Sequence, residues 1–326
     1  GLVAGLAVAV TGAVLSASLP LPPQPGLQID ATVSNAGDLY ALSRPLIADY
    51  SRPPVLMAVA RLPSDDLSFR LTDASTGLSV DDLVVHDDAL IHLLIIGPDG
   101  QLWHLHPIRV APGEFQVHFV PPADGHYAVS AELERRGGGV QLVRAADGLD
   151  VGGVVSRGSP AYGIAGVTAG RRVTTMVSGV PVSILASGSV AGTAVTLTVG
   201  FGSSATLQPW LGMLGHLIVI GPVPAGVPVG QAAQRAPVWA HAHSMGDLTP
   251  GMNMPGMSSG TSSDDRSMAG LMPVNGDSAA DETVAAYGPS ISFTFTFGSP
   301  GRYLLWIQAE RDYRILTVPA VLEVTG

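Results

Sequence analysis

Short runs in which apolar and polar residues alternate, rich in β-branched and aromatic side chains, recur along most of the chain. A period of two residues predicts half-buried β-strands. In the first half, strands are predicted at 54–62, 67–73, 90–97, 101–107, 114–120 and 126–134, with a return strand within 140–151. In the second half, they are predicted at 173–178, 180–187, 194–200, 215–221, 238–243, 290–297, 303–310 and 315–324. No stretch beyond the N-terminus has a helical period, so the pattern predicts an all-β protein.

The same series of motifs occurs twice, in the same order. HLLIIGP begins at His92 and HLIVIGP at His216; WHLHP then begins at Trp103 and WAHAHS at Trp239. Further on, Gly-His-Tyr and Gly-Arg-Tyr each open a long apolar run. Ordered repetition of this kind indicates an internal duplication. We therefore predict two tandem Ig-like or cupredoxin-like β-sandwich domains at residues 49–152 and 171–326, joined by a glycine-containing linker at 153–170.

The first 19 residues are apolar and uncharged, and a proline-rich break follows them. Such a segment is typical of a transmembrane anchor or of the apolar region of a signal peptide. We assign residues 1–20 to this segment and residues 21–48 to a tether or a leading strand. Residues 1–19 then anchor the protein to a membrane or export it. Both alternatives predict an extracytoplasmic location, in the periplasm or at the cell surface.

Charge and cysteine content narrow the chemistry. The net charge is −10, and the basic residues are all scattered arginines, so no basic stripe is present to bind nucleic acid. Cysteine is absent, which excludes disulfides, iron–sulfur clusters and cysteine-ligated blue copper. Any metal site must therefore use histidine, methionine, carboxylate or backbone oxygen.

The first histidine motif lies on a predicted hairpin. Pro98-Asp99-Gly100 is typical of a three-residue loop that closes with a left-handed glycine. This loop places Leu94 opposite His104 and His92 opposite His106, so that all three imidazoles project from one face within reach of one metal ion. His86, six residues before His92, is the candidate fourth ligand. Asp87 and Asp88, which follow it, are expected to be solvated turn residues.

The second histidine motif comprises His216, His241 and His243, and its hairpin loop runs from 221 to about 237. A loop of that length does not fix the register, which we infer by analogy with the first copy. Met213 and Met245 lie nearby in the sequence and could add thioether ligands. His118 and His126 have no duplicate, and we expect them to be surface residues.

A Gly/Ser/Asp-rich insertion with little strand character extends over residues 244–290. It holds most of the methionines, with Met245, Met252, Met254 and Met257 at its start, and thioethers suit monovalent copper. Its GMNMPGM run resembles the Met-rich segments of periplasmic copper-resistance and copper-chaperone proteins, which are cupredoxin-like or Ig-like β-sandwiches. The paired histidine hairpins also resemble a group of uncharacterised secreted bacterial proteins.

These patterns favour extracytoplasmic copper binding, buffering or delivery, with a membrane cuproenzyme or membrane complex as a partner and zinc as the alternative metal. The alternative is a membrane-anchored accessory subunit or Ig-like interaction module whose histidines are structural. A third hypothesis is a β-sandwich metal oxidoreductase, but no catalytic constellation stands out, so we expect a protein that is not an enzyme. Convergence of the imidazoles would favour metal binding, whereas divergence to opposite faces would favour the structural role.

Overall fold

The computed structural model describes residues 52–136, 140–152, 163–244 and 286–326. The predicted N-terminal segment 1–20, the tether 21–48 and most of the insertion 244–290 lie outside the described residues, as do Met245, Met252, Met254 and Met257. Among the described residues, no helix has both the length and the apolar character that a membrane span requires.

The first domain is a sandwich of two sheets. One sheet has the order β1 (Val55–Arg61), β2 (Asp66–Asp73), β7 (Glu114–His118), β6 (Ile108–Ala111). The other has the order β10 (Leu149–Val151), β8 (Gly125–Arg135), β4 (Ile91–Ile96), β5 (Leu102–Leu105), and β3 (Leu83–Val84) and β9 (Val140–Arg144) also pair with β8. Phe69, Phe115 and Tyr127 are buried between the sheets. The alternating pattern forms this core because successive strand residues point to opposite faces.

The second domain repeats this architecture. One sheet has the order β11 (Ala165–Val167), β20 (Arg314–Val324), β19 (Gly301–Arg311), β16 (His216–Gly221), β17 (Val238–His243), with β15 (Leu207–Gln208) on β19. The facing sheet has the order β12 (Val173–Val177), β13 (Val180–Ala186), β14 (Ala194–Phe201), β18 (Ser290–Thr296). The protein is therefore all-β, with two tandem Ig-like sandwiches, as predicted. The predicted linker 153–170 is too long, because β11 lies within it and pairs in parallel with β20.

The strand pairings also correct one detail of the duplication. Trp103 lies opposite Ile95 and packs into the core of its own domain, whereas Trp239 lies opposite Ile220 and packs toward the other domain. The two tryptophans are therefore not equivalent, and Leu102 is the counterpart of Trp239. The second copy has one more residue between tryptophan and histidine, which reverses the face on which the tryptophan lies.

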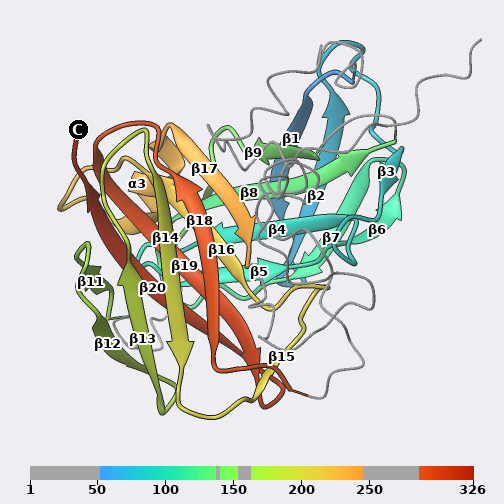
Figure 1. Cartoon of the computed structure of the whole chain (residues 1–326). Helices are drawn as coiled ribbons and strands as arrows, with labels where there is room; N and C mark the ends of the chain where they lie inside the picture. Colours follow the sequence, from blue (N-terminus) through green and yellow to red (C-terminus); the bar gives the residue numbers. More distant parts are fainter. Residues whose placement is uncertain (1–51, 137–139, 153–162, 245–285) are drawn as a thin grey trace, which may run out of the picture.

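The two domains pack together through the outer faces of their histidine-bearing sheets (Figure 1). Strands β4 and β16 are buried along their whole length, because one face of each meets its own core and the other meets the neighbouring domain. Leu94 and Ile96 share an apolar cluster with Ile218 and Trp306. The Trp306 indole N–H donates to the Gly100 carbonyl at 2.8 Å across this interface.

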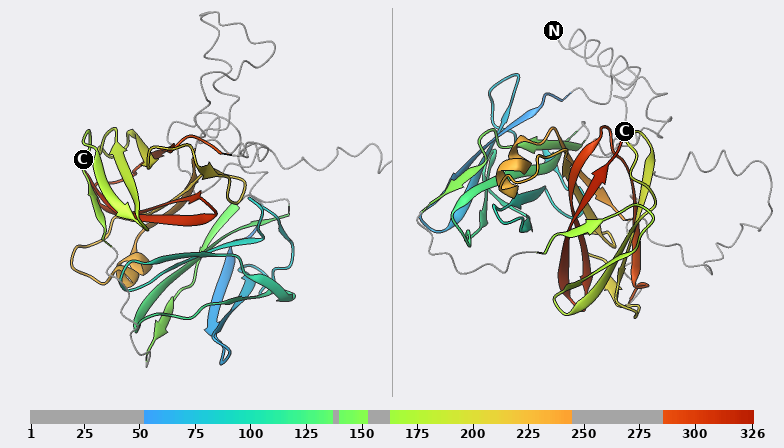
Figure 2. Two further views of the ribbon diagram at one scale, coloured as in Figure 1. Left: turned by 90° about the horizontal axis from the view of Figure 1, so that it is seen from below. Right: turned by 90° about the vertical axis from the view of Figure 1, so that its left-hand side faces the viewer.

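A short helix, α3 (Val229–Arg235), lies in the loop between β16 and β17 and packs against the first domain (Figure 2). The Val229 backbone N–H donates to the Pro98 carbonyl at 3.1 Å, and the Gln234 side-chain Nε2 donates to the Ala145 carbonyl at 2.7 Å. A β-carbon at Gly230 would lie 2.0 Å from the His126 carbonyl oxygen, so only glycine allows this contact. The expectation of no helix was wrong here, because seven residues are too few to establish a helical period.

Candidate metal centre

The loop chemistry predicted for the first hairpin is confirmed. The Gly97 amide donates to the Gln101 carbonyl at 2.9 Å, and Gly100 has a left-handed φ of +89°. Leu94 consequently lies opposite His104. The ligand nitrogens of His92, His104 and His106 all lie within 4.8 Å of one another, so the first trio converges as expected.

The second hairpin has the register that the analogy predicted. His216 lies opposite His243, and Ile218 lies opposite His241, which puts all three imidazoles on one face of β16 and β17. This trio is more deeply buried than the first. His216 and His241 are inaccessible to solvent and His243 is 2% exposed, whereas His104 and His106 are partly exposed.

The structure joins the two trios, which the sequence analysis treated as separate sites. The ring centroid of His104 lies 5.5 Å from that of His216 and 5.3 Å from that of His241, and the centroids of His92 and His241 are 5.8 Å apart. We call His92, His104, His106, His216, His241 and His243 the histidine cluster. It forms because apolar residues on the same strand faces as the histidines, among them Leu94, Ile96 and Ile218, pack the two histidine-bearing sheets together.

The hydrogen bonds of His92 and His104 fix their tautomers when both rings are neutral. His92 Nε2 lies 2.9 Å from the His86 carbonyl oxygen, so this nitrogen must carry the proton. His104 Nδ1 lies 3.1 Å from Gln308 Oε1 and donates in the same way. The remaining nitrogens, His92 Nδ1 and His104 Nε2, face each other at 3.1 Å. Each therefore presents a lone pair to the other, and a cation between them would relieve the repulsion.

The second domain repeats this arrangement. His216 Nε2 donates to the Trp210 carbonyl at 3.1 Å, and His241 Nδ1 lies 3.2 Å from a carboxylate oxygen of Glu132. The nitrogens left over, His216 Nδ1 and His241 Nε2, are 3.0 Å apart. With both rings neutral, lone pairs again face each other, at a separation that suits two nitrogen ligands of one metal ion.

Burial favours the neutral, metal-ligating form of four imidazoles of the cluster, those of His92, His104, His106 and His216. Desolvation lowers the pKa of His92 to about 3, with the neighbouring His241 contributing. Desolvation also lowers the pKa values of His104 and His216 well below the ordinary value, and His106 is lowered in the same direction. His104 is partly exposed, but the rings of Trp210 and of the other histidines lie around it. A proton is therefore a poor occupant of the gap between His92 and His104.

The contacts across the interface are reciprocal. His104 of the first domain is held by Gln308 of the second, and His241 of the second is held by Glu132 of the first. Glu132 and Gln308 are equivalent positions, because each lies seven residues after the glycine that begins its strand. The cluster thus has an approximate two-fold axis, and each domain positions a histidine of the other.

Glu132 is a site residue that the sequence analysis missed. It is completely buried, and its register position opposite His92 places it beside the cluster. Burial opposes its ionisation, but His241 and the other neighbouring imidazoles lower its pKa well below the ordinary value. The available signal was a carboxylate that directly follows the largely apolar stretch 127–131 of β8.

The structure places two further predicted residues differently. His86 lies with Asp87 and Glu132, and its ring centroid is 6.3 Å from that of His92. The expectation that Asp87 is a solvated turn residue was wrong. Its side chain is 14% exposed, and its carboxylate lies 3.4 Å from His243 Nε2. Asp88, the next residue, is exposed as expected.

Three other candidate residues, Met213, His118 and His126, belong to neither the histidine cluster nor the group of His86, Asp87 and Glu132. Met213 is buried and pairs through its backbone with Trp210, so its role as a ligand stays a prediction. His118 is exposed and pairs with Asp66 at 3.1 Å, as expected of a surface residue. His126 is more enclosed than expected, with 15% side-chain exposure, and pairs with Asp150 at 2.8 Å.

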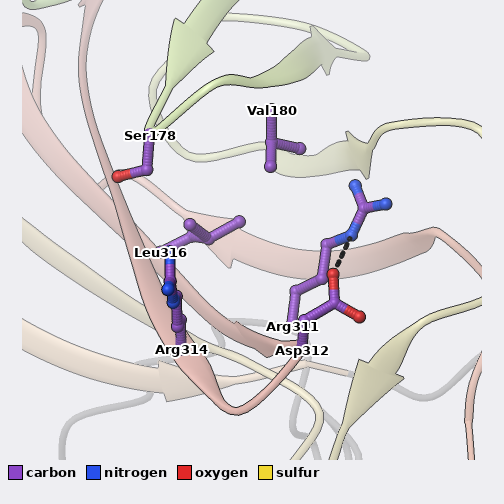
Figure 3. A pocket seen from close by; sticks show the side chains of 6 residues that line it. All are labelled: Ser178, Val180, Arg311, Asp312, Arg314 and Leu316. Carbon is purple, nitrogen blue, oxygen red and sulfur yellow. Dashed lines mark ion pairs between the residues drawn. The ribbon is translucent and has the colours of Figure 1, made fainter.

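A separate pocket lies in the second domain, at the turn between β12 and β13 and the hairpin of β19 and β20 (Figure 3). Arg311 and Arg314 contribute two cations to its lining, and Arg311 pairs with Asp312 at 3.4 Å. The pocket contains no residue of the histidine cluster, so the histidine cluster is the better-supported site.

Comparisons with known proteins address the fold alone. No family model matches the chain, and no curated protein matches it significantly. A tetra-tandem repeat from the extending region of a large adhesion protein is 12% identical, with 83% of this chain and 50% of that chain covered and a TM-score of 0.22. This chain therefore spans half the length of that structure. A two-domain fibronectin type III segment of chicken tenascin is 9% identical, with coverage of 83% and 99% and a TM-score of 0.19.

Proposed function

We propose that this protein binds a transition metal ion, copper(II) in the first instance, at the histidine cluster between its two domains. The observation that carries this proposal is the pair of close nitrogen contacts, His92 Nδ1 to His104 Nε2 at 3.1 Å and His216 Nδ1 to His241 Nε2 at 3.0 Å. In each contact, the other ring nitrogen already donates to an acceptor of the protein. When both rings of each pair are neutral, a bound cation would convert two repulsive contacts into coordination bonds.

The donor set favours copper(II). Four imidazoles, two from each domain, surround the approximate two-fold axis, and nitrogen-rich sites bind copper(II) more tightly than other divalent ions of the first row. His104 belongs both to the set with His92 and His106 and to the set with His216 and His241. Because His104 has only one available lone pair, we expect one copper ion per cluster. Zinc is the alternative metal, since it also accepts imidazole ligands.

Buffering or delivery fits this site better than a permanently enclosed ion. His104 and His106 are partly exposed, whereas His216 and His241 are buried. An ion could therefore enter past His104 and His106 and then bind His216 and His241. We further propose that the N-terminal segment places the domains outside the cytoplasm and that the Met-rich insertion collects monovalent copper, while the cluster takes the divalent ion. A membrane cuproenzyme would receive the copper.

The test is a copper(II) titration of the purified full chain after chelator treatment, followed by metal analysis and electron paramagnetic resonance. We expect about one tightly bound copper per chain from the cluster, with nitrogen hyperfine coupling from several imidazoles. A double variant, His104→Gln with His241→Gln, removes one ligand from each domain and should abolish that tight site. Glutamine retains polar character in the interface.

The matched control is His118→Gln, which removes an exposed histidine that lies against Asp66. Circular dichroism and thermal melting of each variant report whether the fold is kept. Unchanged copper stoichiometry and an unchanged spectrum in a folded His104→Gln, His241→Gln variant would overturn the proposal and favour histidines that only support the domain interface.

A further inference from the structure

We propose a second metal site beside the histidine cluster, formed by His86, Asp87 and Glu132, which takes a divalent ion of the zinc type. We call these three residues the mixed site. Their ligand atoms all lie within 4.8 Å of one another. The mixed site uses none of the four imidazoles that surround the two-fold axis, and this inference therefore does not depend on copper binding there.

The individual distances fit a shared ion. His86 Nε2 lies 3.2 Å from Asp87 Oδ2 and 3.5 Å from Glu132 Oε1. Ligands at the usual 2.0–2.2 Å from a tetrahedral zinc ion are about 3.3–3.6 Å apart. Both contacts are long for strong hydrogen bonds but match the edges of a coordination polyhedron. The same Asp87 oxygen also lies 3.4 Å from His243 Nε2, so the three residues directly adjoin the histidine cluster.

The two carboxylates supply an independent reason to place a cation here. Glu132 is completely buried, and its Oε1 accepts no hydrogen bond of good geometry among the described residues, with His86 Nε2 beside it at 3.5 Å. Asp87 Oδ2 is also buried without a hydrogen-bond partner in the described part of the chain. A buried carboxylate oxygen without such a partner is costly, and a directly bound cation would satisfy it.

The surroundings orient the ligands toward a common point. Asp87 and Asp88 have left-handed φ angles of 45° and 63° in a two-residue turn, and His86 and Ala89 are bridged at its ends. This turn brings the Asp87 carboxylate back beside the His86 ring. At the other ring nitrogen, His86 Nδ1, the Glu134 carboxylate lies 3.6 Å away. The negative charge of this carboxylate favours a cation bound at the other nitrogen of the ring.

The duplication provides an internal comparison. The second domain has the same tight turn, with Trp210 bridged to Met213 and left-handed φ angles at Leu211 and Gly212. In the second domain, the residues at the positions of His86, Asp87 and Glu132 are Trp210, Leu211 and Gln308, respectively. None of these is a good metal ligand. The fold does not require the carboxylates, since one copy forms the same turn and strand without them.

The donor set also distinguishes the ion from copper. One imidazole with two carboxylates is a harder set than the imidazoles of the histidine cluster, and it suits zinc or a similar divalent ion. The other oxygen of Glu132 lies 3.2 Å from His241 Nδ1. Glu132 would thus connect the two metal sites, as a ligand of one and an orienting group of the other.

Calorimetric titration with zinc, together with the visible spectrum of the cobalt(II)-substituted full chain, tests this inference. Zinc can also bind imidazoles, so we expect two tightly bound zinc ions in the wild-type protein. Asp87→Asn with Glu132→Gln should retain one, bound up to about tenfold more weakly because Glu132 also orients His241. Asparagine suits the left-handed turn, and glutamine occupies the equivalent position in the second domain. His104→Gln with His241→Gln should also retain one, and the four changes together none.

Asp88→Asn is the matched control, because it changes the neighbouring carboxylate of the same turn, and it should keep both ions. If the double variant does not fold, Asp87→Asn alone should weaken the second zinc site at least about tenfold. Two zinc ions in a folded Asp87→Asn, Glu132→Gln variant would overturn the mixed site and leave the histidine cluster standing. Loss of zinc in that variant, with no loss in His104→Gln, His241→Gln, would support the mixed site and count against the proposed function.

Discussion

The two domains contribute the same strands and the same histidine trios to their interface, yet their side chains differ at the positions around the trios. The first domain has His86, Asp87 and Glu132 where the second has Trp210, Leu211 and Gln308. The shared residues form the symmetric part of the interface, and the different residues give the first domain two carboxylates where the second domain has none. The symmetric part thus supports a shared ligand, whereas the asymmetric part favours a site in one domain only.

The largest expected effect is a loss of stability at Trp306, which the second domain contributes to the apolar interface. Trp306 is buried and donates its indole N–H to the Gly100 carbonyl of the other domain, whereas its counterpart in the first domain is the small Ser130. Trp306→Ala should lower the free energy of unfolding by about 3–5 kcal/mol, because it removes a large side chain and a buried hydrogen bond. Denaturant unfolding measures this change.

Ser130→Ala is the comparison for Trp306. Its hydroxyl donates to the Val143 carbonyl at 3.2 Å, so we expect a loss of about 1 kcal/mol. Equal losses for Trp306→Ala and Ser130→Ala would contradict the view that the second domain supplies the main anchor of the interface.

A substitution at Gln308 would make the two sides of the histidine cluster more alike. Gln308→Glu would place a carboxylate beside His104 Nδ1, as Glu132 lies beside His241. A carboxylate increases the basicity of a histidine ligand, so copper(II) affinity should rise by up to about tenfold. Competition with a chelator of known affinity measures it. Weaker copper binding in the folded variant would contradict the assignment of Gln308 as an orienting group.

A smaller, pH-dependent contribution to stability is expected from an ion pair that only the first domain has among the described residues. Arg135 pairs with Asp73 at 2.7 Å, whereas its counterpart Arg311 donates to the Phe201 carbonyl. The hydrogen bond from Arg135 lowers the pKa of Asp73 well below its ordinary value. This pair therefore stabilises the folded protein above the unfolded-state pKa of about 3.9, and the contribution decreases as the pH falls below it.

Asp73→Asn should accordingly lower the melting temperature more at pH 7 than at pH 3. Thermal melts of the variant and the wild type at both pH values measure the difference. The same decrease at both pH values would show that Asp73 acts through its turn hydrogen bonds to Ser75 and Thr76 rather than through its charge.

The smallest effect is expected at His118, which lies outside the shared interface. Its side chain is 68% exposed where it pairs with Asp66, and exposed pairs of this kind contribute little. His118→Ala should leave the melting temperature and the metal stoichiometry unchanged within error. A loss of bound metal would show that histidines outside the interface also bind ions.

The sequence by itself determined the local features of this protein. Alternation predicted the strands, and the loop formed by Pro98, Asp99 and Gly100 predicted the register that puts His92, His104 and His106 on one face. The repeat of HLLIIGP as HLIVIGP predicted the second domain and its trio. These features follow from period-two patterns and turn chemistry, which act over a few residues.

Only the tertiary structure decided that the two trios form one cluster and that Glu132 and Asp87 belong beside it. A strand pattern shows which residues share a face, but it does not show what covers that face. Here apolar residues on the same strand faces as the histidines pack the two sheets against each other, with Leu94, Ile218 and Trp306 in one cluster. Contacts such as that of His241 with Glu132 join residues far apart in the sequence, and their chemistry arises from burial between domains that no local pattern encodes.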